Sequence, residues 1–150
     1  MIRVQAQDFD AGAEIDAMRE RCADADAGGL CSFIGVVRAG DGADQITSMT
    51  LEHYPGMTQR EMARIEAEAR QRWPLADVVI IHRTGRLVPG DQIVLVLTAS
   101  RHRKVSLAAA EFLIDWLKTK APFWKSEAAG GETRWVAARA SDDEAAAKWD

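Results

Sequence analysis

The segment QIVLVLTASRHRKVSLAAAEFLIDWLK, residues 92–118, decides the fold that we predict for this chain. Its first nine residues form an apolar run with the length and composition of a strand. From residue 103 the apolar residues recur every three or four positions, which predicts an amphipathic helix over 103–120. A strand that leads directly into a long helix indicates a mixed fold. The side chains expected on the buried face of this helix are Leu107, Ala110, Leu113, Ile114 and Leu117.

Working outward, similar patterns predict the other elements. Residues 30–38 are apolar at both alternating sets of positions, which predicts a buried strand. Further strands are expected at 2–5, 46–54 and 77–85, helices at 11–23 with Asp10 as N-cap and from Pro55-Gly56 to about Trp73, and a hairpin at 123–138. No repeat or linker interrupts residues 1–150. We therefore expect a single α+β domain with a mostly antiparallel sheet, about three helices, and a polar tail from about residue 141.

Composition narrows the possible classes of function. The chain is 47% hydrophobic and 28% charged, as in ordinary globular proteins. The first residues, MIRVQAQDFDAG, do not resemble a leader peptide, and no apolar run approaches the roughly 18 residues of a membrane span, so we expect a cytoplasmic protein without a membrane segment. The spacing of Cys22, Cys31 and the three histidines suggests neither a disulfide nor a metal site, and we expect no cofactor.

The charge is unevenly distributed. Residues 101–125 contain six lysines and arginines against two carboxylates, a net charge of +4, so the rest of this chain of net charge -4 carries -8. A nucleic-acid-binding protein usually has a basic balance overall, so we expect no nucleic-acid partner. A basic island on an acidic protein favours a specific anionic ligand.

The first part of this island, RHRK at 101–104, lies where the predicted strand meets the helix. Cations are unfavourable at a helix start, where the backbone already carries a partial positive charge, but exposed N–H groups there bind anions. His102 and Arg103 could therefore form an anion site. A solvated cluster of outward-pointing cations explains the pattern equally well.

The second part of the island is the segment LKTKAPFWKSE, residues 117–127. Lys118 falls in the last helical turn, where a cation complements the helix dipole. Pro122 cannot continue the helix, so Lys125 must return on a new element. A lysine beside bulky aromatic rings suits acid–base work, although a surface lysine is the simpler interpretation. Arg38 ends an apolar strand before a glycine-rich loop and could bind a phosphate or cap the sheet edge.

Five segments in this order resemble the large, catalytic subunit of molybdopterin synthase. The resemblance covers about residues 2–140. The departures are small: Arg101 replaces a smaller residue, Ser106-Leu107 replaces an Ala-Phe type pair, and Ser126 stands where a basic residue is common. The segments are FIGVVR (33–38), LEHYPGM (51–57), IIHRTGRLVPGDQIVLV (80–96), HRKVSLAAAEFLIDWLK (102–118) and APFWKSE (121–127).

The resemblance implies an activity and an assembly. The family installs the two dithiolene sulfurs of molybdopterin on cyclic pyranopterin monophosphate, a step of molybdenum cofactor biosynthesis. The sulfur arrives as a thiocarboxylate on the C-terminal Gly-Gly tail of a small ubiquitin-like subunit. Two large subunits form a homodimer within a heterotetramer, and the fold is an α/β hammerhead joined to an antiparallel sheet.

The resemblance also assigns residues. Lys118 and Lys125 are expected to be catalytic, with acid–base and electrostatic roles. His102 and Arg103 could serve the pocket of the neighbouring subunit, and Phe33 and Phe112 are expected to pack in the core rather than against the pterin. The expected substrate-binding residues are Val36, Val37, Arg38, His102, Arg103, Lys118, Lys125, Ser126 and Glu127.

Two rival hypotheses stay open at this point. One is a self-contained persulfide sulfurtransferase that uses Cys31, although this cysteine alternates within an apolar strand as a core residue would. The other is a non-catalytic binding module for a ubiquitin-like protein. The first requires a cysteine for activity, and the second requires neither Lys118 nor Lys125.

Overall fold

A computed structural model describes residues 1–42, 45–137 and 139–150, so part of the predicted loop at 39–45 lies outside the described residues. Four helices and eight strands make up the described part of the chain. In order they are β1 (Ile2–Gln5), α1 (Ala11–Arg21), β2 (Gly29–Val36), β3 (Ser48–His53), α2 (Met57–Arg72), β4 (Leu75–Arg83), β5 (Gly85–Leu87), β6 (Gln92–Ser100), α3 (Arg103–Lys120), β7 (Phe123–Ala129), β8 (Glu132–Val136) and α4 (Ala140–Ala147).

The strands form two four-stranded sheets, with the orders β1-β4-β6-β2 and β5-β3-β7-β8. β1 pairs with β4 in parallel, and the other pairs are antiparallel. The predicted α+β class with mostly antiparallel strands is therefore confirmed. None of the described helices is long and apolar enough to cross a membrane.

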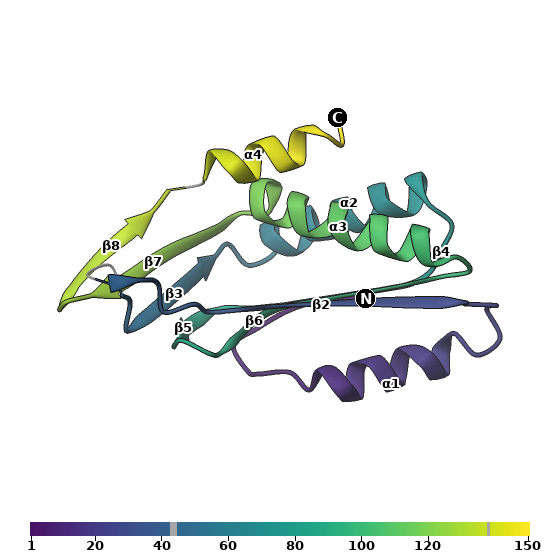
Figure 1. The fold of residues 1–150 in the computed structure, drawn as a ribbon, viewed down its shortest axis with the longest axis horizontal. Coiled ribbons are helices and arrows are strands. Elements are labelled where there is room, and N and C mark those ends of the chain that lie inside the picture. The colour runs from purple at the N-terminus through teal and green to yellow at the C-terminus, as the bar shows by residue number, and fades with distance from the viewer. Residues whose placement is uncertain (43–44, 138) are drawn as a thin grey trace.

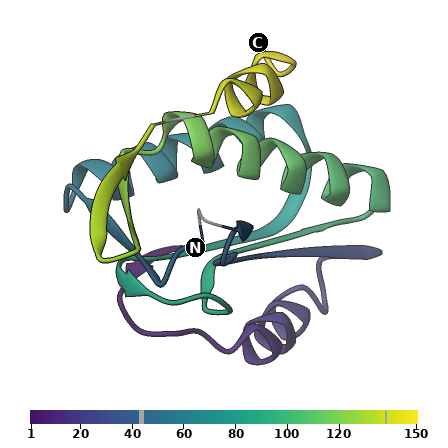
Figure 2. The ribbon, with the colours of Figure 1, turned by 60° about the vertical axis from the view of Figure 1, so that its left-hand side comes forward.

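Helices cover both faces of the first sheet. α2 and α3 lie on one face and α1 on the other, while α4 lies over α3 on the outside (Figure 1). Figure 2 shows the same layers from another side, with the hairpin of β7 and β8 beside the helices. The core between the sheet and the α2–α3 layer includes Phe112 and Leu113, and the core under α1 includes Met18. β6 contributes to both cores, because its alternating side chains point to opposite faces.

The predicted helix ends have clear local causes. The Asp10 side chain accepts a hydrogen bond from the Ala13 N–H and caps α1 as expected. Gly56 precedes α2 with a φ of 81°, a conformation that favours glycine. α3 ends at Lys120, two residues before Pro122, and β7 begins at the next residue, Phe123. The helix therefore ends where the sequence predicted a break, and β7 continues outward beyond the end of α3 (Figure 1).

The prediction that residues 30–38 form a buried strand is wrong in two respects. The strand is Gly29–Val36, and it lies at an outer edge of its sheet. Its side chains are largely exposed, including Phe33 at 40%, which was expected in the core. Phe112, by contrast, is fully buried as expected.

Two further predictions need correction. The tail from about residue 141 is not simply polar chain, because it forms α4, and Trp149 just beyond the helix packs edge-on against Trp73 and Phe112. The number of described helices is therefore four rather than three. Leu107 was expected on the buried face of α3 but is 57% exposed, because the buried face in the first turns is formed by Ser106, Ala109 and Ala110 instead.

Candidate functional site

Lys118 and Lys125 lie on two successive elements, α3 and β7, on either side of Pro122. Lys118 is in the last turn of α3, and its side chain is 56% exposed. Lys125 is on β7 and its side chain is 33% exposed. Each lysine has a carboxylate nearby: Lys118 Nζ lies 3.5 Å from Asp142 Oδ1 of α4, and Lys125 Nζ lies 3.4 Å from Glu127 Oε1. The prediction that the second lysine lies on a new element is confirmed.

Contacts from distant parts of the chain hold the junction between α3 and β7 in place. The buried Thr58 hydroxyl donates a hydrogen bond of 3.1 Å to the Pro122 carbonyl. The Phe123 ring stacks on His82 with 3.8 Å between ring centroids and 16° between ring planes. Burial lowers the pKa of His82 to about 4, so this ring is neutral at physiological pH. The stacked ring thus fixes the start of β7, two residues before Lys125, without adding charge.

Arg38 reaches the same region from the end of β2. Val37 is buried in a cluster with Leu51 and Leu87, and its backbone pairs with Asp91. Leu51 lies directly opposite Lys125 in the β3–β7 register, so the two side chains share one face of the sheet. Val37 and Lys125 are therefore neighbours of the same leucine. The exposed Arg38 follows this anchored valine.

Ser126 and Glu127 lie on opposite faces of β7, because side chains alternate along a strand. Glu127 is on the same face as Lys125 and forms the ion pair with it. Ser126 points to the other face and is only 8% exposed. Of these two predicted residues, Glu127 is the one placed beside the lysine.

The other basic cluster occupies the start of α3. The first turn of α3 has no acidic residue, and the N-cap residue His102 makes no capping hydrogen bond through its side chain. A shallow pocket of about 380 Å³ is lined by Gly28, Arg101, His102, Arg103 and Lys104. Arg101 also forms an ion pair of 3.1 Å with Asp26. The other two cations, Arg103 and Lys104, lie in the first turn of α3, where the backbone N–H groups have no acceptor within the helix. This arrangement suits an anion.

Small residues and hydroxyl groups hold this cluster against β2. A Cβ added to Gly28 would lie 2.4 Å from the Arg101 carbonyl oxygen, so this position has no room for a larger residue. One added to Gly29 would lie 3.3 Å from the Arg103 Cα, which is a tight contact. The Ser106 hydroxyl donates to the Gly29 carbonyl at 2.8 Å. The Ser100 hydroxyl donates to the His102 carbonyl, also at 2.8 Å.

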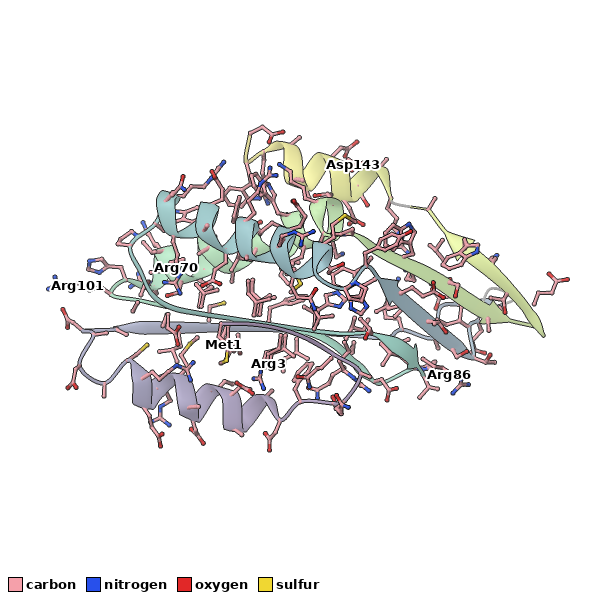
Figure 3. All side chains as sticks on the ribbon, turned by 180° about the vertical axis from the view of Figure 1, so that it is seen from behind. Met1, Arg3, Arg70, Arg86, Arg101 and Asp143 are labelled. Carbon is pink, nitrogen blue, oxygen red and sulfur yellow. The ribbon has the colours of Figure 1, made fainter. Side chains whose placement is uncertain are left out.

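The structure keeps the two basic clusters apart within one chain. Arg103 and Lys118 are fifteen residues apart on α3, which at the rise of an α-helix is a separation of about 22 Å. Figure 3 shows Arg101 at one end of the molecule and Asp143, the neighbour of Asp142, well away from it on α4. Side chains from the two clusters cannot act on the same atoms in one chain.

Several residues of the site were not predicted from the sequence. Asp142 lies in the tail that was expected to be polar chain, Thr58 is in the first turn of α2, and His82 is on β4. Thr58 meets Pro122 across 64 positions of the chain, and Lys118 meets Asp142 across 24. No local sequence pattern predicts such contacts. The predicted helix start near Gly56 indicates that Thr58 lies in the first turn of a helix. It does not indicate that Thr58 bonds to Pro122.

The cysteines have properties of core residues rather than nucleophiles. Burial raises the pKa of Cys22, as does the negative charge of Asp77, and burial raises the pKa of Cys31. A raised pKa leaves less thiolate, which is the reactive form. Among the described residues, no group of three or more histidine, cysteine, aspartate or glutamate side chains could hold a metal ion. A second shallow hollow, which includes Cys22 and Leu30, lies apart from both basic clusters.

Comparisons with known proteins agree on one family. A family model described as MoaE protein matches residues 4–120. The molybdopterin synthase catalytic subunit of Ralstonia nicotianae is 51% identical over 148 residues, which cover 99% of this chain and 83% of that protein. The solved structure of the molybdopterin biosynthesis MoaE protein from Burkholderia ambifaria MC40-6 matches with a TM-score of 0.84 and 49% identity, over 99% of this chain and 97% of that one. Molybdopterin synthase from Staphylococcus aureus matches with a TM-score of 0.80 and 27% identity, over 90% and 96% of the two chains.

Proposed function

The chain belongs to the MoaE protein family, and from this membership we propose that it is the catalytic subunit of a molybdopterin synthase. It transfers sulfur to cyclic pyranopterin monophosphate and so builds the dithiolene of molybdopterin. The observation that carries this proposal is the break at Pro122, which leaves Lys118 in the last turn of α3 and puts Lys125 on the strand that follows, β7. Two lysines held by separate rigid elements make a fixed cationic site for an anionic donor.

The sulfur donor is the C-terminal thiocarboxylate of a small ubiquitin-like subunit. A thin Gly-Gly tail can reach side chains that a folded surface cannot. Lys118 and Lys125 neutralise the thiocarboxylate and exchange protons as sulfur is transferred and the cyclic phosphate opens. Their present partners, Asp142 and Glu127, are carboxylates at 3.5 and 3.4 Å. These ion pairs support the proposal that each ammonium group binds an anionic group of the donor or substrate.

Arg38 and the cluster of His102 and Arg103 hold the substrate. Arg38, which follows the buried Val37, binds the phosphate, since a guanidinium offers paired donors to phosphate oxygens. His102 and Arg103 are about 22 Å from Lys118 along α3, so they contribute to the site of a second copy. Val36 and Glu127 line the same region, whereas a substrate contact of the buried Ser126 stays a prediction.

The assembly is a homodimer of this chain that binds two copies of the small subunit, and the reaction takes place in the cytoplasm. Each small subunit inserts its tail toward Lys118 and Lys125 of one large subunit. Affinity comes mainly from apolar contacts of the tail and the surrounding surface, because exposed ion pairs contribute little. Removing the last two residues of the small subunit should therefore abolish sulfur transfer but only partly weaken the complex.

The test is to mix the chain with a thiocarboxylated small subunit and cyclic pyranopterin monophosphate and to measure the dithiolene product. The double variant Cys22→Ala/Cys31→Ala should keep full activity, because the sulfur is carried by the partner. Loss of product in this variant, with folding intact, would favour a persulfide mechanism. Product formation that persists without both Lys118 and Lys125 would reduce the chain to a binding module.

A further inference from the structure

The helix α4 brings a carboxylate from the end of the chain to Lys118. β8 runs back along β7 and pairs Val136 with Lys125, and α4 begins four positions later, at Ala140. Figure 1 shows α4 lying over the end of α3 that leads into β7. In the first turn of α4, Asp142 Oδ1 lies 3.5 Å from Lys118 Nζ. The side chain of Asp142 is 26% exposed and that of Lys118 is 56% exposed, so the carboxylate is the more enclosed member of the pair.

The far end of α4 is anchored by contacts that do not involve Asp142. The Trp149 ring packs edge-on against two aromatic rings of the α2–α3 core, and its indole N–H donates to Asp115 at 2.8 Å. Lys148 Nζ also lies 3.1 Å from Asp115 Oδ2. Asp115 is less than one turn before Lys118 on α3, but its carboxylate is engaged by these two groups of the tail. α4 is therefore held against α3 independently and presents Asp142 to Lys118 from a fixed element.

Helix polarity alone does not account for the position of Asp142. A carboxylate in the first turn of a helix complements the positive end of the dipole, whichever way its side chain points. Asp143 meets the same need, since it lies in the same turn and its backbone N–H, like that of Asp142, bonds to the Arg139 carbonyl. The side chain of Asp143 is exposed, however, and Asp142 is the one of the two that reaches Lys118.

The two lysines obtain their carboxylates in different ways. Lys125 is paired with Glu127 of its own strand, at 3.4 Å. The residues that follow Lys118, TKAP at 119–122, include no carboxylate. Lys118 therefore takes its partner, Asp142, from a separate helix at the other end of the β7–β8 hairpin.

We propose that Asp142 is a positioning residue of the active site, which holds the Lys118 ammonium charged and in place for the anionic sulfur donor. The inference rests on the proposed function, in which Lys118 neutralises the thiocarboxylate. A lysine side chain loses rotamer freedom when it is held in one geometry, and a fixed carboxylate holds the ammonium before the donor arrives. Because an ammonium has three N–H donors, it can keep its contact with Asp142 while it donates to the terminal anion of the tail.

The test removes the charge of Asp142 and keeps its shape. In Asp142→Asn the rate of a single turnover should fall by about 10–10²-fold, because a group misplaced by about 1 Å can lose that much of its effect. The affinity for the small subunit should stay as in the wild type, since exposed ion pairs contribute little to binding. Asp142→Glu, which restores the charge, should regain most of the rate. Asp143→Asn removes the same charge from the same helical turn and is the matched control, which should turn over like the wild type.

A double-mutant cycle shows whether Asp142 acts through Lys118. In the Lys118→Ala background, Asp142→Asn should lower the remaining rate no further, because the group that it positions is absent. An equal loss of rate in both backgrounds would overturn the proposal, as would Asp142→Asn with wild-type turnover. So would a variant that keeps its turnover but binds the small subunit more weakly, since Asp142 would then belong to the contact surface of that partner.

Acetylation of Lys118 gives a readout that needs neither substrate nor small subunit. A short pulse of acetic anhydride, followed by peptide mass spectrometry, measures how readily each lysine amine reacts. Lys118 should be acetylated faster in Asp142→Asn than in the wild type, because loss of the carboxylate frees the amine. Lys120, which is paired with Asp150 instead, should react equally in both proteins. Equal acetylation of Lys118 in the two proteins would contradict the inference, whereas a wild-type chain that makes no product would contradict the proposed function.

Discussion

At the scale of single residues, the account depends on two lysines whose surroundings differ. Replacing Lys118 or Lys125 with alanine should lower the rate of a single turnover by about 10²–10³-fold, because each removes one fixed electrostatic group. Folding should survive, since an exposed ion pair such as Lys118–Asp142 contributes at most about 1 kcal/mol. Quenched-flow measurement of the dithiolene product checks both variants.

Lys120 provides the control for this prediction. Its ammonium lies 3.3 Å from the centroid of the Trp116 ring and 3.7 Å from Asp150, away from β7. Lys120→Ala should therefore keep near-normal turnover and lose only a little stability. Equal losses of rate in all three variants would indicate a general effect of charge rather than a site formed by Lys118 and Lys125.

His82 should make the stability of the fold depend on pH. Burial, with a smaller contribution from the charge of the nearby His53, lowers its pKa from 6.5 to about 4. Between these values the unfolded chain binds a proton that the folded chain does not, so the contribution is complete above about pH 6.5 and is lost as the pH falls toward 4. At pH 5 the loss relative to pH 8 is about 2 kcal/mol.

Urea unfolding of the wild type and of His82→Phe at pH 8 and pH 5 isolates this contribution. Phenylalanine keeps a ring to stack on Phe123 but cannot bind a proton. The free energy of unfolding should fall by about 2 kcal/mol more in the wild type than in the variant. An equal fall in both proteins would show that His82 does not titrate as its burial implies.

The residues of the site could be predicted from the sequence only in part. Pro122 is a local signal, and it correctly placed Lys118 at a helix end and Lys125 on a new element. The contacts that hold them, from Thr58 and His82, join positions far apart in the chain. Such contacts arise from tertiary packing, which hydrophobic periodicity does not encode.

At the scale of elements, β2 shows why an apolar pattern is ambiguous. Apolar residues at both alternating sets of positions predict burial on both faces. The pattern does not distinguish a central strand from an edge strand, which has a neighbouring strand on one side only. One side of β2 pairs with β6, and the other side is open in the single chain. α4 was missed for a related reason, since its alanine-rich turns have only a weak amphipathic pattern and one anchoring side chain, Trp149, lies beyond them.

Trp149 should hold α4 on the rest of the fold. Its ring contacts Trp73 and Phe112, its indole N–H donates to Asp115 at 2.8 Å, and its carbonyl accepts from Arg72. Trp149→Ala should lower the free energy of unfolding by about 2–3 kcal/mol, because it opens a partly buried aromatic cluster. Amide hydrogen exchange should show α4 losing its protection.

Trp135→Ala is the matched control. Trp135 lies on β8 and is 64% exposed, so its loss should change stability by less than about 0.5 kcal/mol. Unchanged protection of α4 in Trp149→Ala would mean that the ion pairs of Lys148 with Glu111 and Asp115 are enough to hold the helix.

At the scale of the whole molecule, the two basic clusters lie at opposite ends of α3. Arg103 begins the helix and Lys118 lies in its last turn. In the proposed homodimer, each active site combines Lys118 of one copy with Arg103 of the other.

The central claim is that one active site uses Lys118 of one copy and Arg103 of the other, and mixed dimers test it most directly. Arg103→Ala and Lys118→Ala should each be nearly inactive alone. When the two are unfolded and refolded together, half of the dimers are mixed and each mixed dimer has one intact site, so product formation should recover to about one quarter of the wild-type rate. If both residues act within the same chain, no mixed dimer has an intact site, and a mixture that stays as inactive as its parents would contradict the claim.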